Sequence, residues 1–182
     1  NGDINYLNMD MLPDFWESDL YIVFGSSYIK GVLADELIKR HAINIHMGVS
    51  PFYRGTSCNF WALFDGNPEL VGATIHYLSK GLDSGDILYH ALPKAKKVDP
   101  FILGMEAVRI AQESLKDKIV DGSIFNITPQ KQDKLQEYRY AKNDEFTDAI
   151  AEQYMSNLPT SEYIYNKMKN RDVCFLVNPY IR

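Results

Sequence analysis

The sequence lacks several patterns that mark large classes of protein. Among its 182 residues are 2 cysteines, too few for a disulfide framework and without a metal-binding spacing, so we expect a reducing, cytoplasmic location. No apolar run approaches the roughly 18 residues that a membrane-spanning helix needs. The polar start at residues 1–5 also lacks the basic flank and apolar stretch of a signal peptide. We therefore expect no membrane partner.

An excess of positive charge is absent as well. The chain has 19 Lys and Arg against 24 Asp and Glu, a formal net charge of −5. Nucleic-acid binding depends largely on neutralising phosphates, so this balance argues against a nucleic-acid partner. The 4 histidines and their acidic neighbours do not show the close, paired spacing of a zinc site, and we expect no metal.

What the sequence does contain is a strand–helix–strand pattern near its start. Residues 20–24 form a continuous apolar run, typical of a strand buried on both faces of a parallel sheet. Residues 28–40 show helical spacing of apolar side chains, and residues 42–47 form a second short strand. Such a unit of about thirty residues is a βαβ unit, which implies a parallel sheet.

The later elements extend this α/β pattern. Strands at residues 71–78 and 87–91, joined by a tight turn, predict an antiparallel hairpin, and residues 100–120 form the longest amphipathic helix. The composition changes after residue 126. We predict a surface linker at 130–144, helices at 146–155 and 161–168, and a short final strand at 174–177. The predicted division is a core at residues 1–125 followed by a linker and small C-terminal extension at residues 126–182.

Two groups of polar residues lie where chemistry could occur. Asn44 and His46 are two positions apart on a predicted strand, so they project from the same face at its C-terminal end, where open α/β sheets place their ligands. Asp83 lies on the turn between the two later strands. Purely structural roles are also open for these residues. Asn44 and His46 fit a strand end that His46 caps, and Asp83 fits an ordinary Asp-Ser-Gly hairpin turn.

The order of four motifs carries more information than any one of them. They are Asn-Ile-His at 44–46, Ser-Pro-Phe-Tyr-Arg-Gly at 50–55, Gly-Ala-Thr-Ile-His at 72–76 and Gly-Leu-Asp-Ser-Gly-Asp-Ile-Leu at 81–88. In this order, over roughly residues 19–120, the chain resembles the formyltransferase superfamily. That superfamily includes methionyl-tRNA formyltransferase, glycinamide ribonucleotide transformylase and the sugar-nucleotide N-formyltransferases.

The resemblance implies a fold and an activity. The fold is Rossmann-like α/β, with a mostly parallel sheet, helices on both faces and an antiparallel hairpin. The activity is that of a one-carbon transferase, which moves a formyl group from 10-formyltetrahydrofolate to the amine of a small acceptor.

The resemblance also implies roles for individual residues. Asn44 and His46 match the invariant pair of the family, and Asp83 matches its catalytic carboxylate. For substrate binding it points to a set of three residues, Arg54, Tyr53 and His76. Asp86 falls where the family varies and is expected to be structural. The pterin part of the folate is expected along two segments, at Phe24, Gly25, Ser26, Tyr28, Ile29 and at Ser79, Gly81, Leu82.

The chemistry of formyl transfer independently requires residues of these types. An amine that attacks a formyl carbonyl generates an oxyanion, and a well-placed hydrogen-bond donor stabilises it by about 3 to 4 kcal/mol. The Asn44 amide is such a donor at any pH, and His46 donates whether neutral or charged. A carboxylate such as Asp83 can take the proton of the attacking amine and return one to the leaving nitrogen.

The chain departs from the family at both ends. The strand, glycine-rich turn and helix that usually open the domain are not found before residue 20, which suggests a fragment, a late numbering start or a truncated paralogue. Residues 20–24 would then form an apolar sheet edge, which residues 1–18 or a second subunit in a homodimer could cover.

The C-terminal part bears on the acceptor. Residues 126–182 are too few, too acidic and too helical for the basic, β-rich domain of methionyl-tRNA formyltransferases. By elimination and family analogy, the expected acceptor is a nucleotide-linked amino sugar, as in polysaccharide biosynthesis. Methionyl-tRNA, glycinamide ribonucleotide, water as in a formyltetrahydrofolate hydrolase, and a non-catalytic remnant stay open as alternatives.

Overall fold

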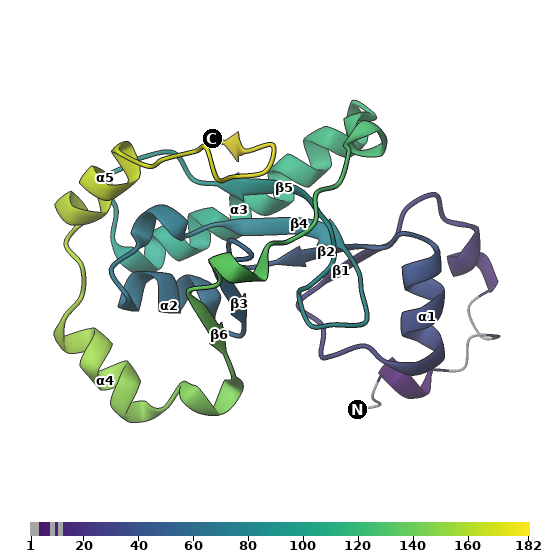
Figure 1. Cartoon of the computed structure of the whole chain (residues 1–182), viewed down its shortest axis with the longest axis horizontal. Coiled ribbons are helices and arrows are strands. Elements are labelled where there is room, and N and C mark those ends of the chain that lie inside the picture. The colour runs from purple at the N-terminus through teal and green to yellow at the C-terminus, as the bar shows by residue number, and fades with distance from the viewer. Residues whose placement is uncertain (1–3, 8–9, 11–12) are drawn as a thin grey trace.

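A computed structural model describes residues 4–7, 10 and 13–182, and its centre is a five-stranded sheet (Figure 1). The strands lie in the order β1 (Ile22–Phe24), β2 (Ile43–His46), β4 (Ala73–Tyr77), β5 (Ile87–Leu92) and β7 (Tyr180–Ile181). β1–β2 and β5–β7 are parallel, whereas β2–β4 and β4–β5 are antiparallel. The predicted antiparallel hairpin is therefore confirmed, and the sheet contains more antiparallel pairing than predicted.

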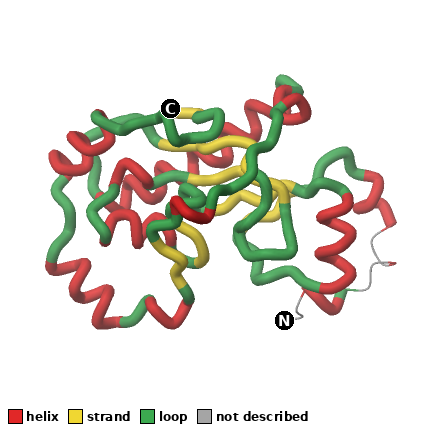
Figure 2. The backbone as a smooth tube through the Cα atoms, viewed as in Figure 1, coloured by secondary structure: helices red, strands yellow, loops and turns green. Residues whose placement is uncertain are grey.

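Helices surround this sheet, as Figure 2 shows. The α-helices are α1 (Gly31–Lys39), α2 (Cys58–Phe64), α3 (Pro100–Val120), α4 (Asp148–Ser156) and α5 (Ser161–Lys169). Short 3₁₀ helices lie at Ile4–Tyr6, Pro13–Glu17, Pro68–Leu70, Ser123–Asn126, Lys134–Gln136 and Asn143–Glu145. None of the helices in the described part of the chain is long and apolar enough to cross a bilayer.

The longest helix, α3, has clear sequence signals at both ends. The Asp99 side chain accepts a hydrogen bond from the Phe101 amide at 2.8 Å, and Pro100 occupies the first helical position. Gly122, with φ of 74°, follows the last turn in the left-handed conformation that commonly ends a helix. These caps explain why the predicted and observed bounds of this helix agree.

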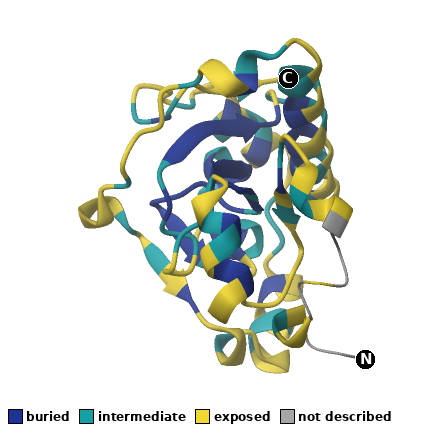
Figure 3. Ribbon diagram, turned by 90° about the vertical axis from the view of Figure 1, so that its right-hand side faces the viewer, coloured by how far each residue is buried: buried dark blue, intermediate teal, exposed yellow. Residues whose placement is uncertain are grey.

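The two faces of the sheet pack against different helices. Ile43 and Ile45 of β2 point to one face, where they join a cluster that includes Ile110 and Leu115 of α3. On the other face Val23 packs against a smaller cluster that contains Leu33 and Leu37 of α1. Figure 3 shows the buried residues concentrated in the central strands and in the helix segments that cover them. Helices on both faces of the sheet are therefore confirmed.

The prediction that the strand at residues 20–24 is buried on both faces is wrong. Ile22 is 47% exposed and Phe24 is 42% exposed, because β1 pairs with β2 alone in the described structure and stands at the sheet edge. The preceding segment covers Tyr21 instead, through a stacked contact with Trp16 at 5.8 Å between ring centroids. The expected apolar sheet edge is thus present.

A second, small sheet ties the predicted linker to the core. β3 (Tyr53–Gly55) pairs in parallel with β6 (Arg139–Ala141). Gly55 has φ of 89°, and a Cβ there would overlap the carbonyl oxygen of Ala141, so the close approach of the two strands requires glycine. Residues 139–141 are therefore paired rather than free, while the domain division at residue 126 stays a prediction.

The C-terminal segment packs on the core at the end of the molecule opposite α1 (Figure 1). Ile164 and Met168 of α5 are buried in the same cluster as Trp61. The final strand predicted at residues 174–177 is wrong, since the sheet is joined by β7 at residues 180–181. The Val177 amide donates to His90 Nδ1 at 2.9 Å, so this amide is not available to a strand ladder. The next residue, Asn178, is left-handed with φ of 41°.

Candidate active site

The site is built first on the pairing of two strands. Asn44 and His46 lie on one face of β2, and the register places His76 of β4 opposite Asn44. His46 is opposite Thr74. The alternation of side chains along each strand therefore brings four polar side chains, those of Asn44, His46, Thr74 and His76, to the same face, away from α3.

The catalytic candidate Asp83 comes from the loop between β4 and β5. Its φ of 47° lies in the left-handed region, which Asp tolerates better than most residues. Two distant segments hold this loop. Gln132 Nε2 donates to the carbonyl oxygens of Asp83 at 2.9 Å and Gly85 at 2.8 Å. Arg54 Nη2 donates to the carbonyl of Leu82 at 2.8 Å.

His76 determines how the Asn44 amide is oriented. The Tyr77 carbonyl oxygen lies 2.8 Å from His76 Nδ1 and can only accept, so Nδ1 carries the proton. In the neutral ring Nε2 is then an acceptor, and Asn44 Nδ2 donates to it at 3.0 Å. Burial, followed by the nearby His46, lowers the pKa of His76 to about 4, so the ring is neutral near pH 7.

Asp83 and His46 complete the cluster. His46 Nδ1 is 3.3 Å from Asp83 Oδ2, and Asn44 Nδ2 is 3.4 Å from Asp83 Oδ1. The other ring nitrogen of His46 is 3.2 Å from the Tyr53 carbonyl oxygen. A neutral imidazole can donate to only one of its two acceptors and a protonated one to both. His46 therefore stands between two acceptors, a carboxylate oxygen of Asp83 and the backbone carbonyl of Tyr53.

Two cavities meet at this cluster. The large cavity has a volume of about 530 Å³ and the small cavity of about 90 Å³. Residues that line both are Ser26, Ser27, Tyr28, Asn44, Leu82 and Asp83. His46 lines the large cavity and His76 lines the small one. Asn44 and Asp83 therefore stand in a wall that the two cavities share.

The residues predicted for folate binding divide between these cavities. Those that line the small cavity are Ser26, Tyr28, Ile29, Ser79, Gly81 and Leu82. Phe24 and Gly25 line the large cavity instead. Tyr28 Oη donates to the Lys80 carbonyl at 2.7 Å, which joins the two predicted segments across the opening.

The three residues predicted for substrate binding are buried in protein contacts. Arg54 Nη1 forms an ion pair with Glu137 Oε2 at 2.8 Å. Tyr53 is 1% exposed; its hydroxyl donates to Asp65 and accepts from Asn67, and burial raises its pKa to about 12. His76 is also 1% exposed and lies behind Asn44. A direct role of these three in substrate binding stays a prediction.

Some lining residues carry no signal in the sequence. Asn143 lines the large cavity although it belongs to the segment predicted to be a surface linker. Gln132, from the same segment, donates hydrogen bonds that hold the Asp83 loop. Their positions follow from the β3–β6 pairing and the Gln130–Ile87 bridge. Both are contacts between residues far apart in the sequence.

Residues 16–100 match the family model described as formyl transferase. This segment, just under half of the chain, is therefore similar in sequence to the formyl transferases. A methionyl-tRNA formyltransferase of Limosilactobacillus fermentum is 35% identical over 108 residues, which cover 57% of this chain and 34% of that protein. The corresponding protein of Listeria innocua is 30% identical over 128 residues, covering 70% of this chain and 40% of its own length. The chain thus spans well under half of these curated relatives.

Solved formyltransferase structures share the fold. The formyltransferase PseJ from Anoxybacillus kamchatkensis, in complex with UDP-4,6-dideoxy-4-formamido-L-AltNAc and tetrahydrofolate, matches with a TM-score of 0.61 at 22% identity, covering 82% of this chain and 78% of its own. A 4-N formyltransferase from Francisella tularensis matches with a TM-score of 0.59 at 19% identity, covering 96% and 71%. The predicted Rossmann-like formyltransferase fold is confirmed.

Proposed function

We propose that this chain provides the catalytic centre of a folate-dependent N-formyltransferase, and that its acceptor is the amine of a nucleotide-linked sugar. One observation carries the proposal. Asn44 and Asp83 stand in the wall shared by two cavities, where they can reach a donor on one side and an acceptor on the other.

The small cavity suits the donor. Its apolar walls come from Val23, Ile29 and Leu78, and its polar groups from Ser26 and Ser79, a combination that fits a flat heterocycle with a polar edge. When bound, 10-formyltetrahydrofolate would supply an activated formyl group. At about 90 Å³ the small cavity is below the usual size of a ligand site, so the donor needs it to widen. Tyr28 and Leu82 are exposed side chains that line both cavities, and their rotation, with loss of the hydrogen bond from Tyr28 to the Lys80 carbonyl, would open one cavity into the other.

The large cavity suits the acceptor. Its volume of about 530 Å³ falls within the range of about 300–1,000 Å³ typical of small-molecule sites. His46, Thr56 and Asn143 add polar groups to its wall. A sugar carries many hydroxyl groups, and side chains of this kind can bond to them.

The roles of the three residues follow from their hydrogen bonds. One N–H of Asn44 is held by His76, while the other makes only a long, 3.4 Å contact with Asp83. We assign this second N–H to the formyl oxygen, where negative charge develops. Asp83 takes the proton that the attacking amine loses, and His46 shares that proton until the leaving nitrogen accepts one.

The choice of a sugar acceptor is supported by the fold comparison. The PseJ structure holds a nucleotide-linked formamido sugar together with tetrahydrofolate, and its fold covers 82% of this chain. The net charge of −5 is also unfavourable for a tRNA acceptor. A cytoplasmic location fits the two free cysteines, Cys58 and Cys174.

Methionyl-tRNA is the second candidate acceptor. The relatives at 30% and 35% identity are methionyl-tRNA formyltransferases, which favours this alternative on sequence grounds.

A transfer assay distinguishes these possibilities. The protein is incubated with 10-formyltetrahydrofolate and, in parallel, a panel of nucleotide-linked amino sugars, methionyl-tRNA, or no amine, and the formamide product is detected by mass spectrometry. We expect formylation of at least one amino sugar. Formylation of methionyl-tRNA alone would establish the second candidate, and donor consumption without an amine would indicate a hydrolase. Binding of tetrahydrofolate without any turnover, or no binding at all, would contradict the proposal.

A further inference from the structure

His90 is a buried histidine that the proposed mechanism does not use. It lies on β5 and is 0% exposed. Its Nδ1 accepts a hydrogen bond from the Val177 amide at 2.9 Å, and its Nε2 is 2.8 Å from the Ser50 carbonyl oxygen. Burial lowers the pKa of His90 to about 4, so the ring carries one proton near pH 7. Because the amide can only donate and the carbonyl can only accept, this proton is on Nε2.

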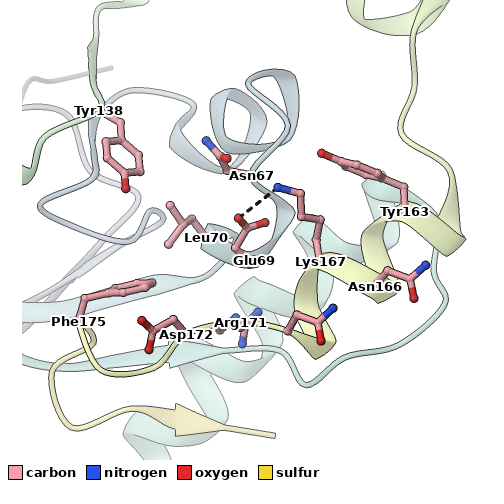
Figure 4. Close-up of a pocket in the computed structure, with 11 residues that line it drawn as sticks. Asn67, Glu69, Leu70, Tyr138, Tyr163, Asn166, Lys167, Arg171, Asp172 and Phe175 are labelled. Carbon is pink, nitrogen blue, oxygen red and sulfur yellow. Dashed lines mark ion pairs between the residues drawn. The ribbon is translucent and has the colours of Figure 1, made fainter.

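The segment that follows α5 lies on one side of His90 and is held at further points. In Figure 4 Arg171 and Phe175 of this segment line a cavity of about 530 Å³ beside α5. Arg171 Nη1 donates to the Pro93 carbonyl at 3.1 Å, and Phe175 packs against the buried cluster that also contains residues of α5. The Val177 amide therefore belongs to a segment that is fixed on the core.

A short turn after β2, which we call the 48–50 turn, lies on the other side of His90. The Ser50 amide donates to Thr74 Oγ1 at 2.8 Å, and the Thr74 hydroxyl donates to the Gly48 carbonyl at 2.6 Å. Ser50 and Thr74 are 0% exposed, as His90 is, so water does not compete for these bonds. Hydrogen bonds therefore lead without a break from Val177 through His90, Ser50 and Thr74 to Gly48.

The 48–50 turn ends against the ring of His46. A Cβ placed on Gly48 would be 2.7 Å from His46 Nε2, so any side chain at this position would displace the ring. The Tyr53 carbonyl oxygen lies 3.2 Å from the same Nε2. Nδ1, the other nitrogen of the ring, faces Asp83 at 3.3 Å. The backbone at Gly48 thus supports the ring on its Nε2 side, while Nδ1 meets the carboxylate.

We propose that His90 is a positioning residue for His46. The β2–β4 pairing sets where His46 stands, and the 48–50 turn, held by His90, sets how its ring is turned toward Asp83. In the described structure His90 lines neither cavity of the catalytic cluster, so it acts through the turn and does not touch substrate. The effect of His90 on formyl transfer rests on the function proposed above, whereas its effect on the His46 ring does not.

Two amide substitutions separate the two hydrogen bonds of the His90 ring. Glutamine places Nε2 near the position of the histidine Nε2, so His90→Gln can still donate to Ser50 but offers Val177 no acceptor. Asparagine places Oδ1 near the position of Nδ1, so His90→Asn can still accept from Val177 but does not reach Ser50. The His90 amide donates to the Val177 carbonyl at 2.9 Å, and both variants keep this backbone bond. Each variant is therefore the matched control of the other.

The rate of formyl transfer, measured well below the unfolding midpoint of each variant, gives the first test. We expect His90→Asn to lower kcat about tenfold or more with little change in KM, because only the placement of a catalytic ring is altered. His90→Gln should keep kcat within about threefold of the unsubstituted protein. Equal losses in the two variants, or no loss in either, would overturn the proposal.

A second pair of variants applies if His90→Asn does not fold. Thr74→Ser keeps the hydroxyl that joins Ser50 to Gly48, and Thr74→Val removes it at nearly the same side-chain size. We expect Thr74→Ser to retain kcat and Thr74→Val to lose about tenfold. Equal kcat values in these two variants would contradict the role of the 48–50 turn.

Nuclear magnetic resonance gives a readout that needs no acceptor. The ring C–H signals of His46 are identified as those missing from the spectrum of His46→Ala. We expect these signals to be shifted or broadened in His90→Asn and to keep their positions in His90→Gln. Unchanged His46 signals in folded His90→Asn would overturn the positioning role. The expected difference in a protein that transfers no formyl group would support the positioning role and contradict the proposed function.

Discussion

The two walls of the catalytic cluster are built in different ways. Asn44, His46 and His76 stand on paired strands, where the β2–β4 register sets their positions. Asp83 stands on a loop in the left-handed conformation and is held from outside by Gln132 and by Arg54. We call these the strand wall and the loop wall.

The difference shows how the site depends on the rest of the chain. The strand wall is positioned by backbone pairing within residues 43–77, and His76 orients Asn44 without help from other segments. The loop wall depends on contacts with residues 54 and 132, which are distant from it in sequence. The carboxylate of the proposed mechanism therefore depends on the C-terminal segment, although it lies in the matched family region.

The largest effect is expected at the loop wall itself. Asp83→Asn removes the proposed proton acceptor while keeping the shape of the side chain, and we expect kcat to fall toward the upper end of roughly 10²- to 10⁴-fold. The measurement is the formyl-transfer rate, with folding checked by circular dichroism. Asp86→Asn is the control in the same loop and should retain nearly full activity. A near-normal rate for Asp83→Asn would remove this residue from the mechanism.

His46→Ala tests the strand wall. It removes the imidazole that contacts Asp83 at 3.3 Å and shares its proton, and we expect a loss of about 10²- to 10³-fold in kcat, in the lower part of the range for proton-transfer groups. Because His46 is buried and contacts the Tyr53 carbonyl, its removal also costs stability, so the rate is measured well below the thermal unfolding midpoint of the variant. A near-normal rate under those conditions would show that His46 serves the fold instead.

Acid should weaken the fold in a defined pH window through two buried histidines, His76 of the strand wall and His90 of β5. Burial lowers the pKa values of His76 and His90 to about 4, from an ordinary value of 6.5. Between these values the unfolded chain binds more protons, so the free energy of unfolding decreases as the pH falls from 6.5 toward 4. Within this window each histidine changes the free energy of unfolding by up to about 1.4 kcal/mol per pH unit. At higher pH neither histidine makes the free energy of unfolding depend on pH.

Urea unfolding across this window measures the effect. His90→Gln should reduce the slope of stability against pH by about half. A stability that stays constant as the pH is lowered from neutral would contradict the neutral, buried state of these two rings.

The smallest effect is expected where the loop wall is supported from outside. Gln132→Ala removes two hydrogen bonds of about 0.5–1.5 kcal/mol each. Because Arg54 still holds the loop at the Leu82 carbonyl, we expect only about half of their sum to be lost from the placement of Asp83, a roughly tenfold fall in kcat. Gln136→Ala is the matched control, since Gln136 Nε2 donates within its own turn to Asp133 at 3.2 Å. An unchanged rate for Gln132→Ala would mean that the loop keeps Asp83 in place by itself.

The secondary structure could largely be predicted, and the exceptions have physical causes. α3 begins and ends at sequence-encoded caps, and the β4–β5 hairpin follows from its apolar strands and tight turn. The apolar run at residues 20–24, which contains β1, predicts a buried strand because hydrophobicity alone cannot distinguish an edge strand from a central one. The final strand was misplaced because the amide of Val177 bonds to a side chain on β5.

The sequence by itself determined that Asn44 and His46 share a face and that Asp83 lies on a turn, because both are local consequences of backbone geometry. Only the tertiary structure decided that Asp83 meets Asn44, 39 positions away, and that His76 orients the amide. Only it placed Asn143 in the large cavity. These depend on strand register and on long-range packing, which no local pattern of residues encodes.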